Sequence, residues 1–387
     1  MISRKEILKL SGAGALGLAA SRAAAAMAGA MPVSAAMPTG ASTSPGATTG
    51  ASAELRRLTT ADLRALPVLK PANAIKRTGH KRTFMLVLAP AMVEPLPGHR
   101  VQARTINGLS PGPVLRMTEG DDIEITIVNR LAQDTGIHWH GVPVPFPMDG
   151  VPMVSQTPIG QGASFVYRWI APQAGTYMYH SHYNDMDQDT IVGMIVVDPQ
   201  DPSREPKYAV DVPIVVTSLP WDPARGVEAQ AVLANSMLMP AMAQNPKADP
   251  NPGMGDSMDR MDMVEYWCFN GKTFPATDPI RVKMGDLIRI RFANITGMTH
   301  PMHLHGHWFR WIAQDGVPLS DPRPMNTIPV DPGRTIDIDF VANNPGVWPL
   351  HCHIIAHMVD NHDQMSGLVT VIQYEGFSLP TMMTAGS

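Results

Sequence analysis

The chain has 387 residues, enough for two or three domains, and 44% of them are hydrophobic, which is ample for packed cores. Charged residues make up only 17%, and the formal net charge of −4 gives no reason to expect a nucleic acid as a partner. The 37 prolines favour an all-β chain whose strands are joined by turns. Because only two cysteines are present, at most one disulfide bond is possible.

The first residues have the pattern of an export signal. Arg4 and Lys5 precede an apolar stretch of small residues that continues to about Ala26. Residues 3–9 are similar to a twin-arginine signal with Lys in place of the second Arg, and an ordinary secretory signal or an uncleaved anchor is the alternative. We therefore predict that residues 1–53 are an export signal and a flexible leader. The mature protein is expected in the periplasm or outside the cell. No stretch after the signal reaches the roughly 18 apolar residues of a membrane span.

Short β-prone runs between turn residues follow in two series. The first is expected at residues 83–88, 122–128, 164–169 and 191–197. The second is expected at residues 280–282, 287–292, 308–312, 335–340 and 367–372. Strands this short and evenly spaced predict two Greek-key β-sandwiches or barrels.

The two series look like copies of one unit. Residues 116–121 (RMTEGD) begin a run in the first series, and residues 281–286 (RVKMGD) begin the corresponding run in the second. Each run leads into a histidine-bearing segment, which begins at His138 and at His300. A repeat with a period near 165 residues predicts two homologous domains.

The domain limits follow from this repeat. We place the N-terminal domain at residues 70–203 and the C-terminal domain at residues 204–376. Residues 237–263 are rich in Met, Pro, Asn, Asp and Gly, and are expected to form a loop or linker.

Four segments concentrate the histidines of the chain. They are residues 138–141 (HWHG), 180–182 (HSH), 300–307 (HPMHLHGH) and 351–353 (HCH), the last followed by His357. Alternate residues of a strand point to the same face, so each His-x-His pair places two imidazoles side by side, where they can bind one metal or two neighbouring metals. Composition alone gives roughly half of one such pair by chance. Five pairs occur, which predicts metal centres.

Cys352 indicates which metal. A thiolate with two imidazoles and a weak axial sulfur is the ligand set of a blue-copper site. His351 and His353 alternate away from the face of Cys352, so its own site should recruit His357 and a histidine from another strand, such as His300. The flanking pair would then face a different metal centre, only a few covalent bonds from the sulfur.

All four segments, in this order, resemble those of the multicopper oxidases, the family of laccases, ascorbate oxidase and bacterial copper-resistance oxidases. Flanking motifs are similar as well: residues 107–108 (NG), 111–113 (PGP), 149–153 (DGVPM), 175–177 (GTY) and 348–350 (WPL). The resemblance covers residues 75–373. It implies two cupredoxin-like domains, copper as the cofactor, and an oxidase that passes electrons from a reducing substrate to dioxygen.

The resemblance also implies the ligands of four coppers. A type 1 copper would be bound by His300, Cys352 and His357, and a type 2 copper by His138 and His303. The two type 3 coppers would be bound by His140, His180 and His353, and by His182, His305 and His351. Cys352 would relay electrons through His351 and His353 to the three-copper cluster. Asp149 matches an acid that assists proton delivery there, and a plain turn carboxylate before Gly150 is the alternative.

The axial ligand of the type 1 copper stays open. His362 occupies the position of the axial residue in the family, but counting back from Gly367 implies a short insertion. That insertion leaves Gln364 or Met365 near the axial place, and we prefer Met365.

The remaining histidines and the second cysteine are expected outside the metal centres. His307 is not a ligand in this scheme and is expected to be structural, whereas His80 and His99 are expected at the surface. Cys268, in an apolar strand without nearby ligands, is expected to be a buried, unreactive thiol.

The spacing of the segments also bears on assembly. Too few residues separate His182 from His300 for an additional domain, so the chain resembles a two-domain oxidase with its type 1 site in the second domain. A trinuclear cluster needs histidines from both domains, and a short connection favours meeting between chains, head to tail. Two-domain relatives close as trimers, so a homotrimer with interfacial clusters is expected.

The electron donor remains open between two classes. A laccase-like enzyme would oxidise phenols or aromatic amines, whereas a copper-resistance enzyme would oxidise Cu(I), for which the seven Met of residues 237–263 offer thioethers. A copper nitrite reductase would need its Cys where Ser181 stands. A non-enzymatic copper store or a scaffold without metals is disfavoured by the intact set of ligands.

Overall fold

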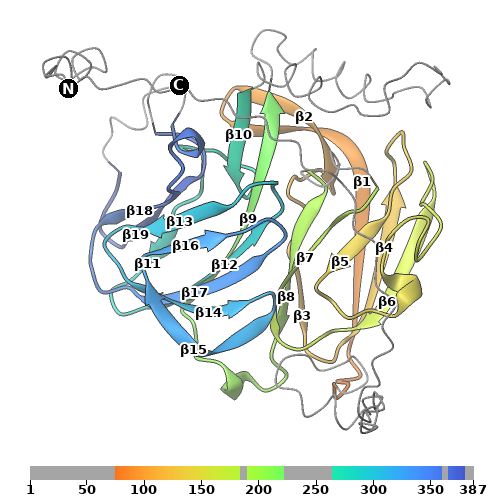
Figure 1. Cartoon of the computed structure of the whole chain (residues 1–387), viewed down its shortest axis with the longest axis horizontal. Helices are drawn as coiled ribbons and strands as arrows, with labels where there is room; N and C mark the ends of the chain where they lie inside the picture. The colour runs from red at the N-terminus through yellow and green to blue at the C-terminus, as the bar shows by residue number, and fades with distance from the viewer. Residues whose placement is uncertain (1–74, 184–189, 222–263, 360–364, 380–387) are drawn as a thin grey trace, which may run out of the picture. The chain divides into compact units, whose positions relative to one another are not determined.

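The computed structural model describes residues 75–183, 190–221, 264–359 and 365–379, all within one compact unit of residues 57–387 (Figure 1). The predicted signal and leader, the Met-rich segment at residues 237–263, and two of the candidate axial ligands, His362 and Gln364, lie outside the described residues. No helix in the described ranges is long and apolar enough to cross a bilayer.

Strands are the main regular structure of the described residues. Helical structure among them is confined to 3₁₀ turns of three residues, such as Phe146–Met148 and Ile355–His357. The predicted all-β class is therefore confirmed. Most predicted runs match observed strands, for example β4 (Asp122–Asn129), β6 (Ser164–Ile170) and β12 (Leu287–Asn294). The run predicted at residues 83–88 is only part of β1 (Lys81–Leu96), whose second part pairs with β2 (His99–Ile106) from Leu88 onward, with a register shift between Val93 and Leu96.

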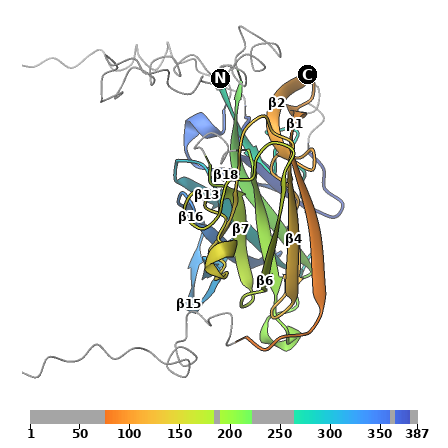
Figure 2. The same cartoon turned by 90° about the vertical axis from the view of Figure 1, so that its right-hand side faces the viewer.

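The first half of the chain builds two four-stranded sheets. One has the order β2-β1-β4-β6; β4 and β6 lie side by side in Figure 2. The other has the order β3-β8-β7-β5, from β3 (Leu115–Thr118), β8 (Val192–Asp198), β7 (Gly175–Ser181) and β5 (Ile137–His140). Apolar residues of both sheets, among them Ile125, Trp139 and Ile195, form one buried cluster. Burial on one face of each strand explains the alternating patterns seen in the sequence.

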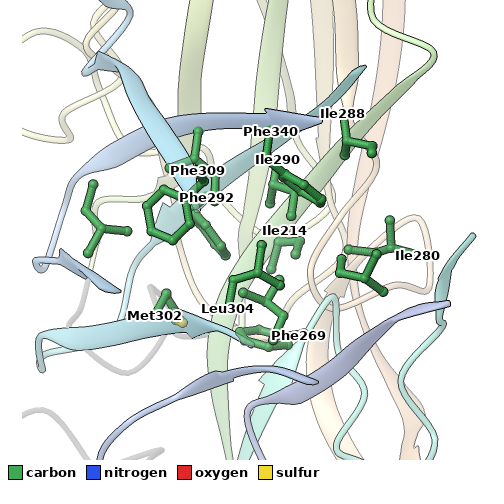
Figure 3. Packing of buried hydrophobic residues seen from close by; sticks show 14 of the residues in the cluster. Ile214, Phe269, Ile280, Ile288, Ile290, Phe292, Met302, Leu304, Phe309 and Phe340 are labelled. Atoms are coloured by element: carbon green, nitrogen blue, oxygen red, sulfur yellow. The ribbon is translucent and has the colours of Figure 1, made fainter. Parts of the chain in front are cut away.

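The second half builds two larger sheets. A six-stranded sheet has the order β10-β9-β12-β17-β14-β15, from β10 (Val264–Phe269), β9 (Val210–Trp221), β12, β17 (Thr335–Val341), β14 (Phe309–Gln314) and β15 (Val317–Met325). A five-stranded sheet has the order β11-β19-β18-β13-β16, from β11 (Ile280–Val282), β19 (Val369–Tyr374), β18 (Val347–Cys352), β13 (His300–Leu304) and β16 (Thr327–Val330). Figure 3 shows Phe292, Phe309 and Met302 in the core that these sheets share.

The two halves repeat one topology. In the first, β1 pairs with β4 in parallel and β5 pairs with β7; in the second, β9 pairs with β12 in parallel and β13 pairs with β18. The repeated Gly-Asp turns are equivalent: Gly120 and Gly285 both have a positive φ, and the following Asp121 and Asp286 each accept a backbone hydrogen bond from three residues earlier. The sequence repeat therefore corresponds to a structural one, while the domain limits at residues 203 and 204 stay a prediction.

A buried polar network joins the halves. Arg291, on β12, has 1% of its surface exposed and donates to Asp211, to Asp337 and to the hydroxyl of Thr176 on β7. Burial alone would raise the pKa of Asp211, but hydrogen bonds from Arg289 and Arg291 hold it well below its ordinary value. Apolar residues continue this contact, with Met178, Val192, Met194 and Val196 packed against Val215 and Ala293.

Candidate metal centres

A buried asparagine organises the approach to the histidines in each half. Asn129 donates to the carbonyl oxygen of Ile159, and its side-chain oxygen accepts from the backbone of Leu131. Asn294 makes the same bonds in the second half, to the carbonyl oxygen of Val330 and from the backbone of Thr296. These loops end at equivalent positions, which are Thr135 in the first half and His300 in the second. Local sequence thus fixes where β5 and β13 begin.

One cluster joins His300, Cys352 and His357, and all three side chains are buried. The sulfur of Cys352 lies 3.7 Å from Nδ1 of His300 and 3.7 Å from Nδ1 of His357, and the two nitrogens are 3.2 Å apart. The sulfur reaches this cluster because β18 alternates: Cys352 faces the core, while His351 and His353 face elsewhere. The residues that the sequence suggested for the blue site are brought together here.

The spacing of these three atoms fits a bound copper. Metal–ligand distances of about 2.0–2.3 Å with angles of roughly 105–120° put ligand atoms roughly 3.2–3.8 Å apart. The donor set, two imidazoles and one thiolate, is the one that blue copper prefers. The site is therefore of the right size and chemistry for one copper ion.

Burial lowers the pKa of both imidazoles, and a hydrogen bond orients His300. Nε2 of His300 is 2.6 Å from the hydroxyl of Thr296, which leaves Nδ1 for a metal. Burial lowers the pKa of His300 to about 4, and His357 adds to the shift. Burial raises the pKa of the Cys352 thiol, a shift opposed by a hydrogen bond from the backbone N–H of Ile354. Copper would supply the positive charge that favours the thiolate.

The first half carries a second cluster, made of His138, His140, His180 and His182. Nδ1 of His140 lies 3.2 Å from Nε2 of His180, and His138 belongs to the same metal-sized group. Nδ1 of His138 donates to the carbonyl oxygen of Asp149, and Nδ1 of His180 to that of Ser181, so each presents Nε2. Burial lowers the pKa of His180 to about 4; the hydrogen bond to Ser181 opposes this shift, and the nearby histidines add to it.

The second half carries the matching cluster of His303, His305, His351 and His353. Nε2 of His305 and Nε2 of His351 are 2.9 Å apart. Nδ1 of His303 donates to the carbonyl oxygen of Asn326, and Nδ1 of His351 to that of Cys352. Two imidazole nitrogens on one metal at about 2.0 Å stand roughly 3.2–3.5 Å apart, close to the closest pair in each cluster.

The two four-histidine clusters stay separate in the described part of the chain. The ring contacts of His138 and His182 are to histidines of the first half, and those of His303 and His353 are to histidines of the second. Three of the eight side chains are exposed, namely His182, His305 and His353. Each cluster is therefore one half of a possible centre, open on one side.

Asp149 lies beside the first cluster, and Met365 follows the last ligand of the blue site in the chain. The carboxylate of Asp149 is 3.4 Å from Nδ1 of His138, and Asp149 also ends the 3₁₀ turn Phe146–Met148. It is thus both a turn residue and a neighbour of the cluster. Met365 is 37% exposed and pairs through its backbone with Val359, just beyond His357. Its role as axial ligand stays a prediction.

The other residues have structural roles. His307 is buried and contacts the hydroxyl of Tyr374 at 2.7 Å. His80 is exposed, and His99 is half-buried, with Nδ1 2.5 Å from the hydroxyl of Tyr266. Cys268 is buried, and its thiol donates to the carbonyl oxygen of Tyr266.

Sequence reasoning missed two neighbours of the blue site. Thr296 hydrogen-bonds His300, and a Thr four residues before a predicted ligand was the available signal. The ring of Trp267 packs against the ring of His357, and nothing in the local sequence of β10 predicted that contact.

The fold and the clusters together define a copper-dependent oxidoreductase of cupredoxin architecture. Family models described as multicopper oxidase match residues 88–202 and 247–371. The solved multicopper oxidase mgLAC is 31% identical, with a TM-score of 0.64, over 78% of this chain and 88% of that one. The blue copper oxidase from Nitrosomonas europaea is 29% identical, also with a TM-score of 0.64, over 76% and 86%. The chain belongs to the multicopper oxidase family, as the sequence predicted, and copper is its cofactor.

A longer relative bears on the substrate. The copper resistance protein A homolog from Pseudomonas syringae is 30% identical over 66% of this chain, and the match covers 46% of that protein. The family uses dioxygen and reducing substrates.

Proposed function

We propose that the protein oxidises a small reducing substrate one electron at a time and reduces dioxygen to two waters. Bound copper would supply the one-electron chemistry and the site for dioxygen. The observation that carries the proposal is the pair of donor sets on β18: Cys352 points to His300 and His357, while the adjacent His351 faces His305. The sulfur of Cys352, on the side that receives electrons, is thus only a few covalent bonds from the imidazole of His351, on the side that delivers them.

We assign the ligands as the family resemblance implies. His300, Cys352 and His357 would bind the type 1 copper, and Met365 is the fourth ligand in this proposal. His138 and His303 would bind the type 2 copper, since each directs Nδ1 to a backbone carbonyl oxygen and leaves Nε2 for a metal. His140 with His180, and His305 with His351, bind separate type 3 coppers, which agrees with the two short nitrogen contacts. His353 and His182 complete these two sets from the opposite cluster.

Asp149 has the role of moving protons in this proposal. Its carboxylate is half-exposed and 3.4 Å from the His138 ring, so it can exchange protons with solvent and hand them inward. Its backbone carbonyl holds His138 in one tautomer at the same time.

The clusters are completed between chains in this proposal, which is a head-to-tail homotrimer. Exposed apolar side chains lie close in sequence to the histidine segments, at Phe146, Met153 and Val154 in the first half and at Trp308 and Ile355 in the second. Exposed apolar groups beside two half-sites are typical of a protein interface. A heterologous contact of this kind closes as a ring, and three copies would form three interfacial clusters.

The donor is either an aromatic reductant or Cu(I), and we favour Cu(I). The seven Met of residues 237–263 are soft ligands suited to it, and one relative is named a copper resistance protein. Deleting residues 237–263 should slow cuprous oxidation far more than oxidation of a bulky phenol. Equal slowing of both would make the segment a linker.

Export is part of the proposal, because the first residues resemble a twin-arginine signal and the mature protein would work in the periplasm or outside the cell. Replacing Arg4 and Lys5 by Gln should leave the precursor inside the cell. Normal export of that variant would contradict the signal.

Copper content, oxygen uptake and sedimentation test the function together. The copper-loaded protein should hold four coppers per chain, absorb intensely in the visible range, consume dioxygen without releasing peroxide and sediment as a trimer. Dilution to monomers should abolish oxygen uptake, because each monomer has only half of every cluster. A colourless protein with full copper, or a fully active monomer, would falsify the scheme; copper binding without oxygen uptake would indicate a copper store.

A further inference from the structure

The strand that covers the blue site contributes an aromatic ring. Successive side chains of β10 point to opposite faces. Tyr266 and Cys268 pack with Val101 and Leu219, away from the site. Trp267 faces the other way and packs against the core that contains Cys352. The indole therefore lies on the same side of β10 as the two ligand imidazoles.

Trp267 contacts both of those imidazoles. Its ring lies 4.0 Å from the ring of His357, centre to centre, at an interplanar angle of 30°. It meets His300 nearly edge-on at 5.2 Å and 65°. His300 and Cys352 are completely buried, and His357 is 4% exposed, whereas Trp267 is half-buried. The indole thus stands between the ligands and the outside of the molecule.

The contact differs in kind from those of five other proposed ligands. His138, His180, His303 and His351 direct Nδ1 to a backbone carbonyl oxygen, and His300 directs Nε2 to Thr296. Such hydrogen bonds fix the plane of a ligand ring. The ring of His357 instead lies along a large flat side chain, which restricts its rotation through van der Waals contact.

We propose that Trp267 is a positioning residue of the blue copper site, an inference that rests on the proposed function. Its indole holds the His357 ring so that Nδ1 faces the sulfur of Cys352, and it keeps water from the outer side of the site. An apolar cover disfavours the more positively charged, oxidised state, so the indole raises the reduction potential. A donor meets the indole first and gives up one electron to the site, with no net oxidation of Trp267.

Three variants test this inference in the copper-loaded full chain. Trp267→Leu removes the ring, and Trp267→Phe keeps a smaller one. Trp311→Leu is the matched control, because Trp311 is also a half-buried indole packed against the same core, and it donates to the carbonyl oxygen of Ala313. The readouts are the visible charge-transfer band, the electron paramagnetic resonance spectrum and the midpoint potential from a redox titration.

Trp267→Leu should shift and weaken the charge-transfer band and lower the midpoint potential, and Trp267→Phe should restore most of both. Trp311→Leu should leave the spectrum and the potential as in the wild type. Wild-type spectrum and potential in Trp267→Leu would overturn the inference, and so would equal changes in Trp311→Leu.

The inference can still be tested if one of the variants does not fold. If Trp267→Leu fails to fold, Trp267→Phe carries the test, since a smaller shift in the same direction is expected and its absence would overturn the inference. Failure of the proposed function has a different signature, a colourless wild-type protein with full copper. The two failures are therefore distinguishable.

Discussion

The two halves of the chain repeat the same strands but differ at one buried position. In the first half, β7 ends with Ser181, whose hydroxyl lies 3.4 Å from that of Thr135. In the second half, β18 ends with Cys352, whose sulfur lies 3.7 Å from Nδ1 of His300. Thr135 and His300 are equivalent in the repeat, and so are Ser181 and Cys352. The backbone thus brings the same two positions together in both halves.

The difference shows that the scaffold alone does not create a blue site. Both halves keep a four-histidine cluster, to which the residues on either side of Ser181 and of Cys352 contribute two histidines each. Only the second half has a soft sulfur donor, from Cys352, and a nitrogen donor, from His300, at these two buried positions. Two hydroxyls in a neutral pocket are poor ligands for copper, which prefers thiolate and imidazole. The side chains at these two equivalent positions therefore decide whether a half can form a type 1 copper site.

The largest expected effect comes from giving the second half the residue of the first. Cys352→Ser should abolish the intense visible absorption and reduce oxidation to background, because the one soft ligand is gone, while the other three coppers stay bound. Absorption, metal analysis and oxygen uptake check this. Cys268→Ser is the matched control, since Cys268 is equally buried but lies outside the site, and it should keep the colour. Blue absorption in Cys352→Ser would exclude that sulfur as the ligand.

A substitution in the contact between the halves is expected to have the next largest effect. Arg291→Met leaves Asp337 buried without its cation, so the free energy of unfolding should fall by about 3–5 kcal/mol. Denaturant unfolding of the metal-free protein measures the loss. Arg168→Ala, which breaks an exposed pair with Glu124, should cost little, because solvent screens that pair. Equal losses in the two variants would show that the buried network does not hold the halves together.

A loop residue that differs between the halves should have a smaller effect. Thr296 bonds the ligand His300, whereas its counterpart in the first half is Leu131. Thr296→Val should weaken copper binding at the blue site by about ten- to a hundredfold, because the His300 ring loses the hydrogen bond that orients it. Competition with a chelator, followed by the visible band, measures this. Thr299→Val, which breaks an exposed bond to Asp331, should leave copper binding unchanged.

Acid should weaken the network between the halves. The pKa of Asp211 is depressed in the folded state, so its contribution to stability is fully present above the ordinary value of about 4 and is lost as the pH falls toward the folded value. Asp211→Asn removes this dependence. The stability difference between the wild type and the variant should therefore shrink as the pH falls below about 4. A constant difference across this range would contradict the depressed pKa.

The smallest effect is expected from giving the first half the residue of the second. Ser181→Cys places a thiol beside Thr135, which is no strong copper ligand, so no second blue band should appear and stability should change by less than about 1 kcal/mol. Adding Thr135→His supplies one imidazole, and new absorption in the double variant only would show that two donors suffice. A new band in Ser181→Cys alone would mean that another ligand lies nearby.

Local patterns predicted much of the fold and the donor sets. Strand alternation explains why Cys352 faces the core while His351 faces another cluster, and the repeat of the Gly-Asp turns predicted two equivalent halves. These features depend on neighbours in the chain, so the sequence contains them directly. The length of β1 was underestimated, because its second part contains Pro90 and Pro95, which argue against a strand, and it is extended by pairing with β2.

What the sequence by itself determined is the chemistry: the residue types, their alternation along single strands and hence the family. Only the tertiary structure decided which distant strand covers the blue site, that Trp267 of β10 lies on His357, and that Arg291 of β12 joins Thr176 of β7. The physical reason is that side-chain direction is set within a strand, whereas the packing of one sheet on another depends on crossing connections and on the volume of the whole core.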